Sequence, residues 1–89
     1  PGYMGYSGDN SDWRVAPNPV ADGNMIRLIP PEGQSAEFVW LTDASGRVLR
    51  EVPLIEAMNG HPVSDMSAGT YFARIQLTGG EWKTARWVK

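Results

Sequence analysis

The feature that most constrains the fold of this chain is the spacing of its apolar residues. They occur in short runs separated by glycine or proline, and no stretch of useful length repeats them every 3.6 residues as an amphipathic helix would. Residues 53–59 are the only helical candidate, and they are too few to predict a helix. Residues 70–77 instead alternate cleanly, and one face carries Tyr71, Ala73, Ile75 and Leu77. The pattern therefore predicts an all-β chain.

Strand-like segments of this kind recur along the whole chain. Residues 36–42 are β-branched and aromatic on both alternating faces, which is typical of a central strand. Residues 53–60 are expected to be irregular. About seven short strands with Gly or Pro between them are typical of an immunoglobulin-like antiparallel β-sandwich or a small barrel, and the sandwich is our prediction. The predicted strands are residues 13–15, 25–29, 36–42, 47–52, 61–64, 70–77 and 81–89.

Turn-forming residues mark the strand ends. Pro17, Asn18 and Pro19 predict a rigid connector, because two prolines fix φ twice and remove two ladder donors. Between two strand-like runs, Asp43 is expected to accept local backbone N–H groups while Gly46 takes a positive φ. Further turns are predicted at Asp22-Gly23-Asn24, Asn59-Gly60 and Gly79-Gly80.

Length and composition limit what the chain can do. With 89 residues it should form one domain, residues 12–89, preceded by a Gly- and Tyr-rich arm or linker at residues 1–11. A net charge of −2 gives no footprint for nucleic acid, and the apolar runs are too short for insertion into a membrane. The N-terminus resembles no signal peptide and lacks an initiator Met, so the chain is expected to be a piece of a longer protein.

Few residues suggest chemistry. His61 is the only histidine and there is no cysteine, so no structural zinc site is predicted. The residue could pair with an acidic side chain, but a plain role as a partly exposed turn or edge residue is favoured. No nucleophile elbow accompanies the Ser and Asp residues, so no catalytic site and no cofactor are predicted. The loop acids Asp9, Asp12, Asp22 and Asp43 could bind calcium, but turn and cap roles are favoured.

Four tryptophans are many for a chain of this length. Trp40, on the predicted central strand, is the candidate for the core. The other three could form an aromatic platform for a sugar or a protein partner, or could simply cover sheet edges and fill the ends of the core. Trp82 and Trp87 have opposite parity in the last strand, so at most one should point inward. The basic residues Lys83, Arg86 and Lys89 would suit an edge strand.

Several motifs in a fixed order resemble one family. Residues 15–23 contain Pro-Asn-Pro followed by Asp-Gly, residues 41–49 carry a strand and an Asp-x-x-Gly-Arg turn, and residues 65–75 read Asp-Met-Ser-x-Gly-x-Tyr. A terminal hairpin follows from Gly79-Gly80 to Lys89. This arrangement resembles the C-terminal sorting domains of the type IX secretion system of Bacteroidetes-type bacteria. Met66 and Trp87 depart from the commoner residues of that pattern.

The resemblance covers residues 14–89 and implies a function. Such domains direct a cargo protein from the periplasm across the outer membrane to the cell surface or the medium. The implied partners are the translocon with its outer-membrane shuttle components and, in many members, a sortase-like peptidase that attaches the cargo to an anionic lipopolysaccharide. Whether the domain is cleaved or retained stays open. The alternative from a different class is a carbohydrate-binding or adhesion module built on exposed tryptophans.

The resemblance also nominates residues. The recognition candidates are Gly69, Tyr71, Gly80, Lys83, Arg86, Trp87, Val88 and Lys89. The structural candidates are Pro17, Asn18, Pro19, Asp22, Gly23, Asp43 and Gly46. For Gly69 and Tyr71 we favour a structural role, in which Tyr71 forms a tyrosine corner through its hydroxyl. An open terminal strand could pair with a translocon component or with a second copy, and loss of residues 87–89 is expected to spare most of the fold.

Overall fold

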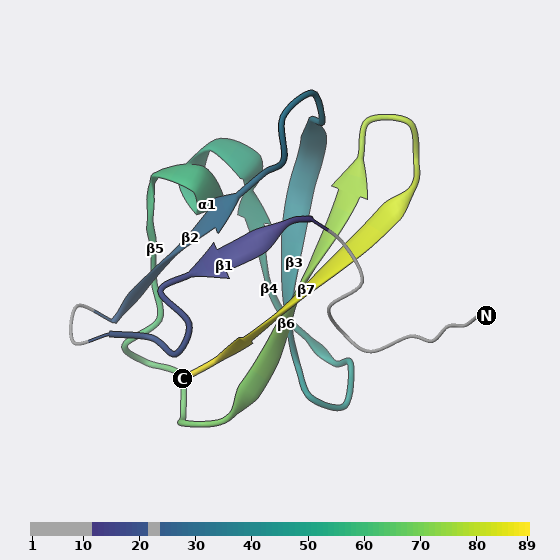
Figure 1. Cartoon of the computed structure of the whole chain (residues 1–89). Helices are drawn as coiled ribbons and strands as arrows, with labels where there is room; N and C mark the ends of the chain where they lie inside the picture. Colours follow the sequence, from purple (N-terminus) through teal and green to yellow (C-terminus); the bar gives the residue numbers. More distant parts are fainter. Residues whose placement is uncertain (1–11, 22–23) are drawn as a thin grey trace.

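The computed structural model describes residues 12–21 and 24–89, over which it forms seven strands and one short helix (Figure 1). The elements are β1 (Arg14–Ala16), β2 (Met25–Ile29), β3 (Ala36–Asp43), β4 (Val48–Pro53), α1 (Leu54–Asn59), β5 (His61–Pro62), β6 (Thr70–Leu77) and β7 (Trp82–Val88). The predicted arm at residues 1–11 and the turn residues Asp22 and Gly23 lie outside the described residues.

The strands form two antiparallel sheets. One has the order β1-β2-β5, and the other has the order β4-β3-β6-β7. The prediction of an all-β sandwich is confirmed, and β3 is the central strand that its two-sided apolar pattern indicated. The observed β2 and β6 have the expected bounds, and each buries one face and leaves the other accessible. In the four-stranded sheet, β7 lies at an edge.

The core lies between the two sheets and contains two tryptophans. Trp13 and Trp87 are fully buried. Trp40 is only half-buried, so the prediction that it plugs the core is wrong. On β3 the inward positions belong to Val39 and Leu41, which places Trp40 on the outer face. Because β3 is apolar on both faces, its sequence alone does not reveal which face is inward.

Helix α1 corrects the prediction of irregular structure at residues 53–60. It begins after Pro53 and ends at Gly60, which has φ of 131° and donates its N–H to the Glu56 carbonyl at 2.9 Å. A helix of six residues has little stability of its own. It forms because Ala57 is buried and because the helix packs against β2 and β3. That support comes from distant parts of the chain.

Candidate functional site

Four segments singled out by the sequence meet at one end of the sandwich, which we call the motif end. The β3–β4 turn, the start of β6 and the C-terminus all lie on the lower side of Figure 1. In register, Asp43 on β3 lies opposite Tyr71 on β6, and Tyr71 lies opposite Trp87 on β7. Asn18 contacts the same stretch of β7. The motif end thus joins residues up to 70 positions apart in the sequence.

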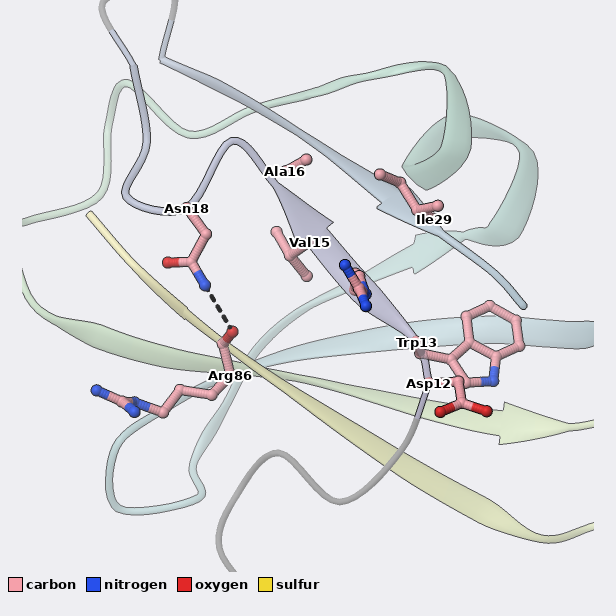
Figure 2. Close-up of a pocket in the computed structure, with 8 residues that line it drawn as sticks. Asp12, Trp13, Val15, Ala16, Asn18, Ile29 and Arg86 are labelled. Carbon is pink, nitrogen blue, oxygen red and sulfur yellow. Dashed lines mark hydrogen bonds between the residues drawn. The ribbon is translucent and has the colours of Figure 1, made fainter.

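Asn18 closes the outer edge of β7. Its Nδ2 donates to the Arg86 carbonyl at 3.2 Å, a bond drawn in Figure 2, and its Oδ1 accepts the Val88 N–H at 3.0 Å. The carboxamide therefore bonds to β7 much as the peptide group of a neighbouring strand would. The Val20 N–H continues this pairing at the Val88 carbonyl, at 2.9 Å. The segment predicted as a connector also covers the end of an edge strand.

The peptide bonds that precede Pro17 and Pro19 are both cis. Asn18 lies between them, and its exposed side chain crosses from the β1 side of the molecule to β7. Pro17 and Pro19 thus lie on either side of Asn18, whose side chain bonds to β7.

Tyr71 and Trp87 form the buried part of the motif end. Their rings stack with centroids 4.8 Å apart and planes inclined by 23°. The Tyr71 hydroxyl donates to the Ser67 carbonyl at 2.6 Å, so the predicted tyrosine corner is confirmed. The indole Nε1 of Trp87 is buried and reaches no acceptor among the described residues. Both residues support the fold, and neither offers a large surface to a partner.

Lys89 is held in place by the start of β6. Its N–H donates to the Gly69 carbonyl at 2.8 Å, and its carbonyl accepts the Gly69 N–H at 2.9 Å. Its ammonium donates to the carbonyls of Ser64 and Met66. Since Trp87 is also fully buried, removing residues 87–89 would remove part of the core. The expectation that the fold survives this deletion conflicts with the structure.

The Asp43 turn forms as its sequence predicted. Asp43 Oδ1 accepts the N–H groups of Ser45 and Arg47, both at 3.0 Å, and the Ser45 hydroxyl at 2.7 Å. These bonds favour the charged carboxylate and lower its pKa below the ordinary value, the Ser45 hydroxyl having the largest effect. Gly46 has φ of 93°, the positive value expected there. The local hydrogen bonds of the turn thus explain why an aspartate is present at position 43.

Of the remaining candidates, Gly80 and Lys83 lie away from the motif end. Gly80 belongs to the turn at the opposite end of the sheet, and Lys83 forms an ion pair with Glu81 at 3.1 Å. Arg86 is exposed beside Asn18. As predicted for opposite parity, Trp82 lies on the outer face while Trp87 is buried. The recognition candidates therefore do not form one surface.

His61 is half-buried on the edge strand β5, as favoured, and it also pairs with an acid, the alternative that was not favoured. Its Nδ1 lies 2.7 Å from Glu56 Oε2, and its Nε2 lies 3.1 Å from Nη1 of Arg50. Because arginine can only donate, Nε2 accepts there and the Nδ1–H donates to Glu56. Arg50 also contacts Asp65 at 2.9 Å and lowers the pKa of that carboxyl through this bond. The group links α1 and β4 to the loop before β6.

A hollow of about 530 Å³ lies between β1 and β7 (Figure 2). Arg14 brings positive charge to it, and Asp12 brings a carboxylate, whereas the guanidinium of Arg86, a residue at its border, points away from it. Its described lining contains no Ser, Cys, His or Lys, so it offers no nucleophile paired with a base. Over residues 12–21 and 24–89, no cluster of acidic and histidine side chains is arranged to hold a metal ion.

Comparison with known proteins adds no relative. No protein-family model, curated protein or solved structure matches the chain. Within the described part of the chain, no helix has the length and apolar character needed to cross a membrane.

Proposed function

We propose that this chain is a C-terminal sorting domain that directs the protein carrying it across the outer membrane through the type IX secretion system. The observation that carries the proposal is the order of its motifs, from the Pro17-Asn18-Pro19 segment through the Asp43 turn and Tyr71 to Lys89. Support also comes from their convergence: Asn18 bonds to β7, and Tyr71 stacks on Trp87. The order of these motifs along the chain has a physical reason, because together they build the motif end.

The structure of the motif end is suited to a signal that the translocon recognises in its folded state. The Asn18 carboxamide already bonds to the Arg86 carbonyl and the Val88 N–H at the outer edge of β7, and we call this pair of hydrogen bonds the Asn18 clamp. A partner strand cannot bond to those groups without displacing it. Trp87 is buried and cannot be contacted directly. We therefore place recognition on the exposed surface of the motif end, where Arg86 and the Asp43 turn are accessible. Pairing with a second copy along this part of β7 faces the same obstacle.

The proposed partners are the type IX translocon and its outer-membrane shuttle components. A sortase-like peptidase and an anionic lipopolysaccharide would act afterwards if the domain is removed. The protein would pass through the periplasm and finish at the outer membrane, at the cell surface or in the medium. The domain itself would perform no catalysis, and no cofactor is proposed.

An export assay tests the proposal. The full chain is fused to the C-terminus of a periplasmically targeted fluorescent reporter and expressed in a bacterium with a working type IX system. We expect the reporter at the surface or in the medium. In a matched strain that lacks the translocon, we expect it in the periplasm. Periplasmic reporter in both strains, with the domain shown to be folded, would overturn the proposal.

Two variants separate folding from recognition. Trp87→Ala removes a buried ring and should block export by unfolding the domain. Arg86→Glu reverses a charge on an exposed side chain and should leave the thermal unfolding temperature nearly unchanged. If the exposed motif end is recognised, Arg86→Glu lowers export while the domain stays folded. Normal export of this variant would move recognition away from Arg86.

A further inference from the structure

The outer face of the four-stranded sheet carries a cluster of aromatic side chains, which we call the aromatic face: Phe38, Trp40, Phe72 and Trp82. All four are half-buried and alternate along their strands with core residues such as Val39 and Ala73. They point away from the core, which lies on the other side of the sheet. Two of the four tryptophans of the chain are thus placed where the core does not use them.

The rings form a continuous surface. Trp40 on β3 and Trp82 on β7 are separated by β6, yet their ring centroids lie 5.0 Å apart with planes inclined by 39°. Phe38 extends the row, with its centroid 5.5 Å from that of Trp40. The two indoles therefore close over β6 and make an apolar platform on the surface of the sheet.

A shallow hollow of about 260 Å³ lies on the same face, between the platform and the Asp43 turn. Its lining comes from the sheet and from the turn: Thr42, Phe72, Arg74 and Thr84, with Ala44, Ser45 and Gly46. An apolar platform beside a recess with polar groups is suited to a ligand that has both an apolar face and hydroxyl groups.

Positive charge accompanies the rings. The guanidinium of Arg74 lies over Trp82, with Cζ 5.1 Å from the ring centroid, and Arg86 lies on the same face opposite Phe72. Among the described residues, neither arginine has a carboxylate within ion-pair distance. One acid, Glu51, lies opposite Trp40 in register. This local charge is opposite in sign to the net charge of −2.

We propose that the aromatic face binds an acidic polysaccharide, one whose sugar units carry carboxylates. The C–H face of a pyranose ring would stack on Trp40 and Trp82. A carboxylate of the sugar would accept a charge-assisted hydrogen bond from the guanidinium of Arg74. The hollow would hold the neighbouring sugar unit. This site goes beyond the proposed sorting role, because its platform is Trp40, Trp82 and Arg74, although it borders Arg86 and the Asp43 turn of the surface proposed for recognition.

Binding is tested by isothermal titration calorimetry on the full chain at fixed ionic strength. The probe is a galacturonic acid hexamer, and the uncharged comparison is a cellulose hexamer. We expect the acidic hexamer to bind with at least about tenfold higher affinity, because a hydrogen bond to a charged group contributes on the order of 1.5–3 kcal/mol. Trp82→Ala should weaken binding by about tenfold or more, whereas Trp82→Tyr should retain part of it.

Charge is tested with a matched pair of variants. Arg74→Gln removes a cation from the aromatic face, and Arg27→Gln removes one from the exposed side of the three-stranded sheet. Only the first should lower the affinity for the acidic hexamer, by about tenfold. Equal losses for both variants would overturn the proposal, since they would indicate attraction by overall charge.

Three other results would also overturn it. These are no binding of either hexamer by a folded chain, equal affinity for the two hexamers, and concentration-dependent dimerisation that Trp82→Ala abolishes. The last result would show that the aromatic face is covered by a second copy of the chain. Near-ultraviolet circular dichroism of each variant verifies that the domain remains folded.

Discussion

The Asn18 carboxamide and the backbone of Val88 form a hydrogen bond across 70 sequence positions, with Oδ1 accepting the Val88 N–H at 3.0 Å. Together with the bond from Nδ2 to the Arg86 carbonyl, it replaces the missing neighbour of an edge strand. An unpaired edge invites pairing with other chains. The side chain therefore both anchors the segment before β2 and limits access to the end of β7.

Replacing Asn18 by Asp should destabilise the domain. The carboxylate can still accept from Val88, but it would place an oxygen against the Arg86 carbonyl, which needs a donor. We expect a loss of about 1 kcal/mol in the free energy of unfolding, measured by urea denaturation. Faster hydrogen exchange at the Val88 amide should accompany it.

Asn59→Asp is the matched control for this substitution. The side chain of Asn59 is exposed and forms no hydrogen bond with any described residue. The same chemical change there should leave Val88 exchange unaltered. If Asn18→Asp is as well tolerated as the control, the clamp does not contribute to stability.

The two buried tryptophans should respond differently to replacement by Phe. Trp13 Nε1 donates to Gln34 Oε1 at 2.8 Å, whereas Trp87 Nε1 has no acceptor among the described residues. Both variants lose the same side-chain volume from a fully buried position. Trp13→Phe should therefore cost about 1 kcal/mol more in unfolding free energy than Trp87→Phe, because it also breaks a hydrogen bond. Equal costs would indicate that the Trp87 indole has a partner.

How much of the fold the sequence predicts depends on how far apart the contacting residues are. The bounds of β6 follow from alternation, and those of β2 follow from a strand-like run that ends at Pro30. The Asp43 turn is stabilised by bonds that span four positions or fewer. Helix α1 escaped prediction because its support comes from distant strands. The prediction for Trp40 was wrong because an apolar pattern on both faces of β3 does not identify the inner one, and the role of Trp13 had been left open between the surface and the core.

The motif end follows the same rule. Tyr71 and its hydroxyl contact with Ser67 were predictable, since four positions separate the two residues. The contact of Asn18 with β7 was not, because nothing in the local sequence says which strand its amide will reach. The aromatic face was missed for a related reason: Trp40 and Trp82 come from strands that are separated by another strand in the sheet. Their proximity depends on the strand order.

The adjacent glycines Gly79 and Gly80 should differ in their tolerance of alanine. Among the described residues, neither position has an atom within 4 Å of an added Cβ, but Gly80 has φ of 98° and Gly79 has no positive φ. Gly80→Ala should lower the free energy of unfolding by about 1 kcal/mol through backbone strain alone. Gly79→Ala should be neutral or slightly stabilising, since it restricts the unfolded chain. Similar losses for both variants would show that space, and not backbone conformation, limits this turn.

The Asp43 turn should make a contribution to stability that depends on pH. Hydrogen bonds, chiefly from the Ser45 hydroxyl, lower the pKa of Asp43 below its ordinary value of 3.8. A lowered pKa in the folded state means that the charged form adds stability above about pH 4 and that this stability disappears as the pH falls through the folded pKa. The destabilisation of Asp43→Asn relative to the natural chain should therefore be constant from pH 7 to about pH 5 and should shrink at lower pH. Nuclear magnetic resonance titration of the Asp43 carboxyl carbon measures the pKa directly, and Ser45→Ala should raise it. A midpoint at or above 3.8 in the natural chain would contradict the assignment.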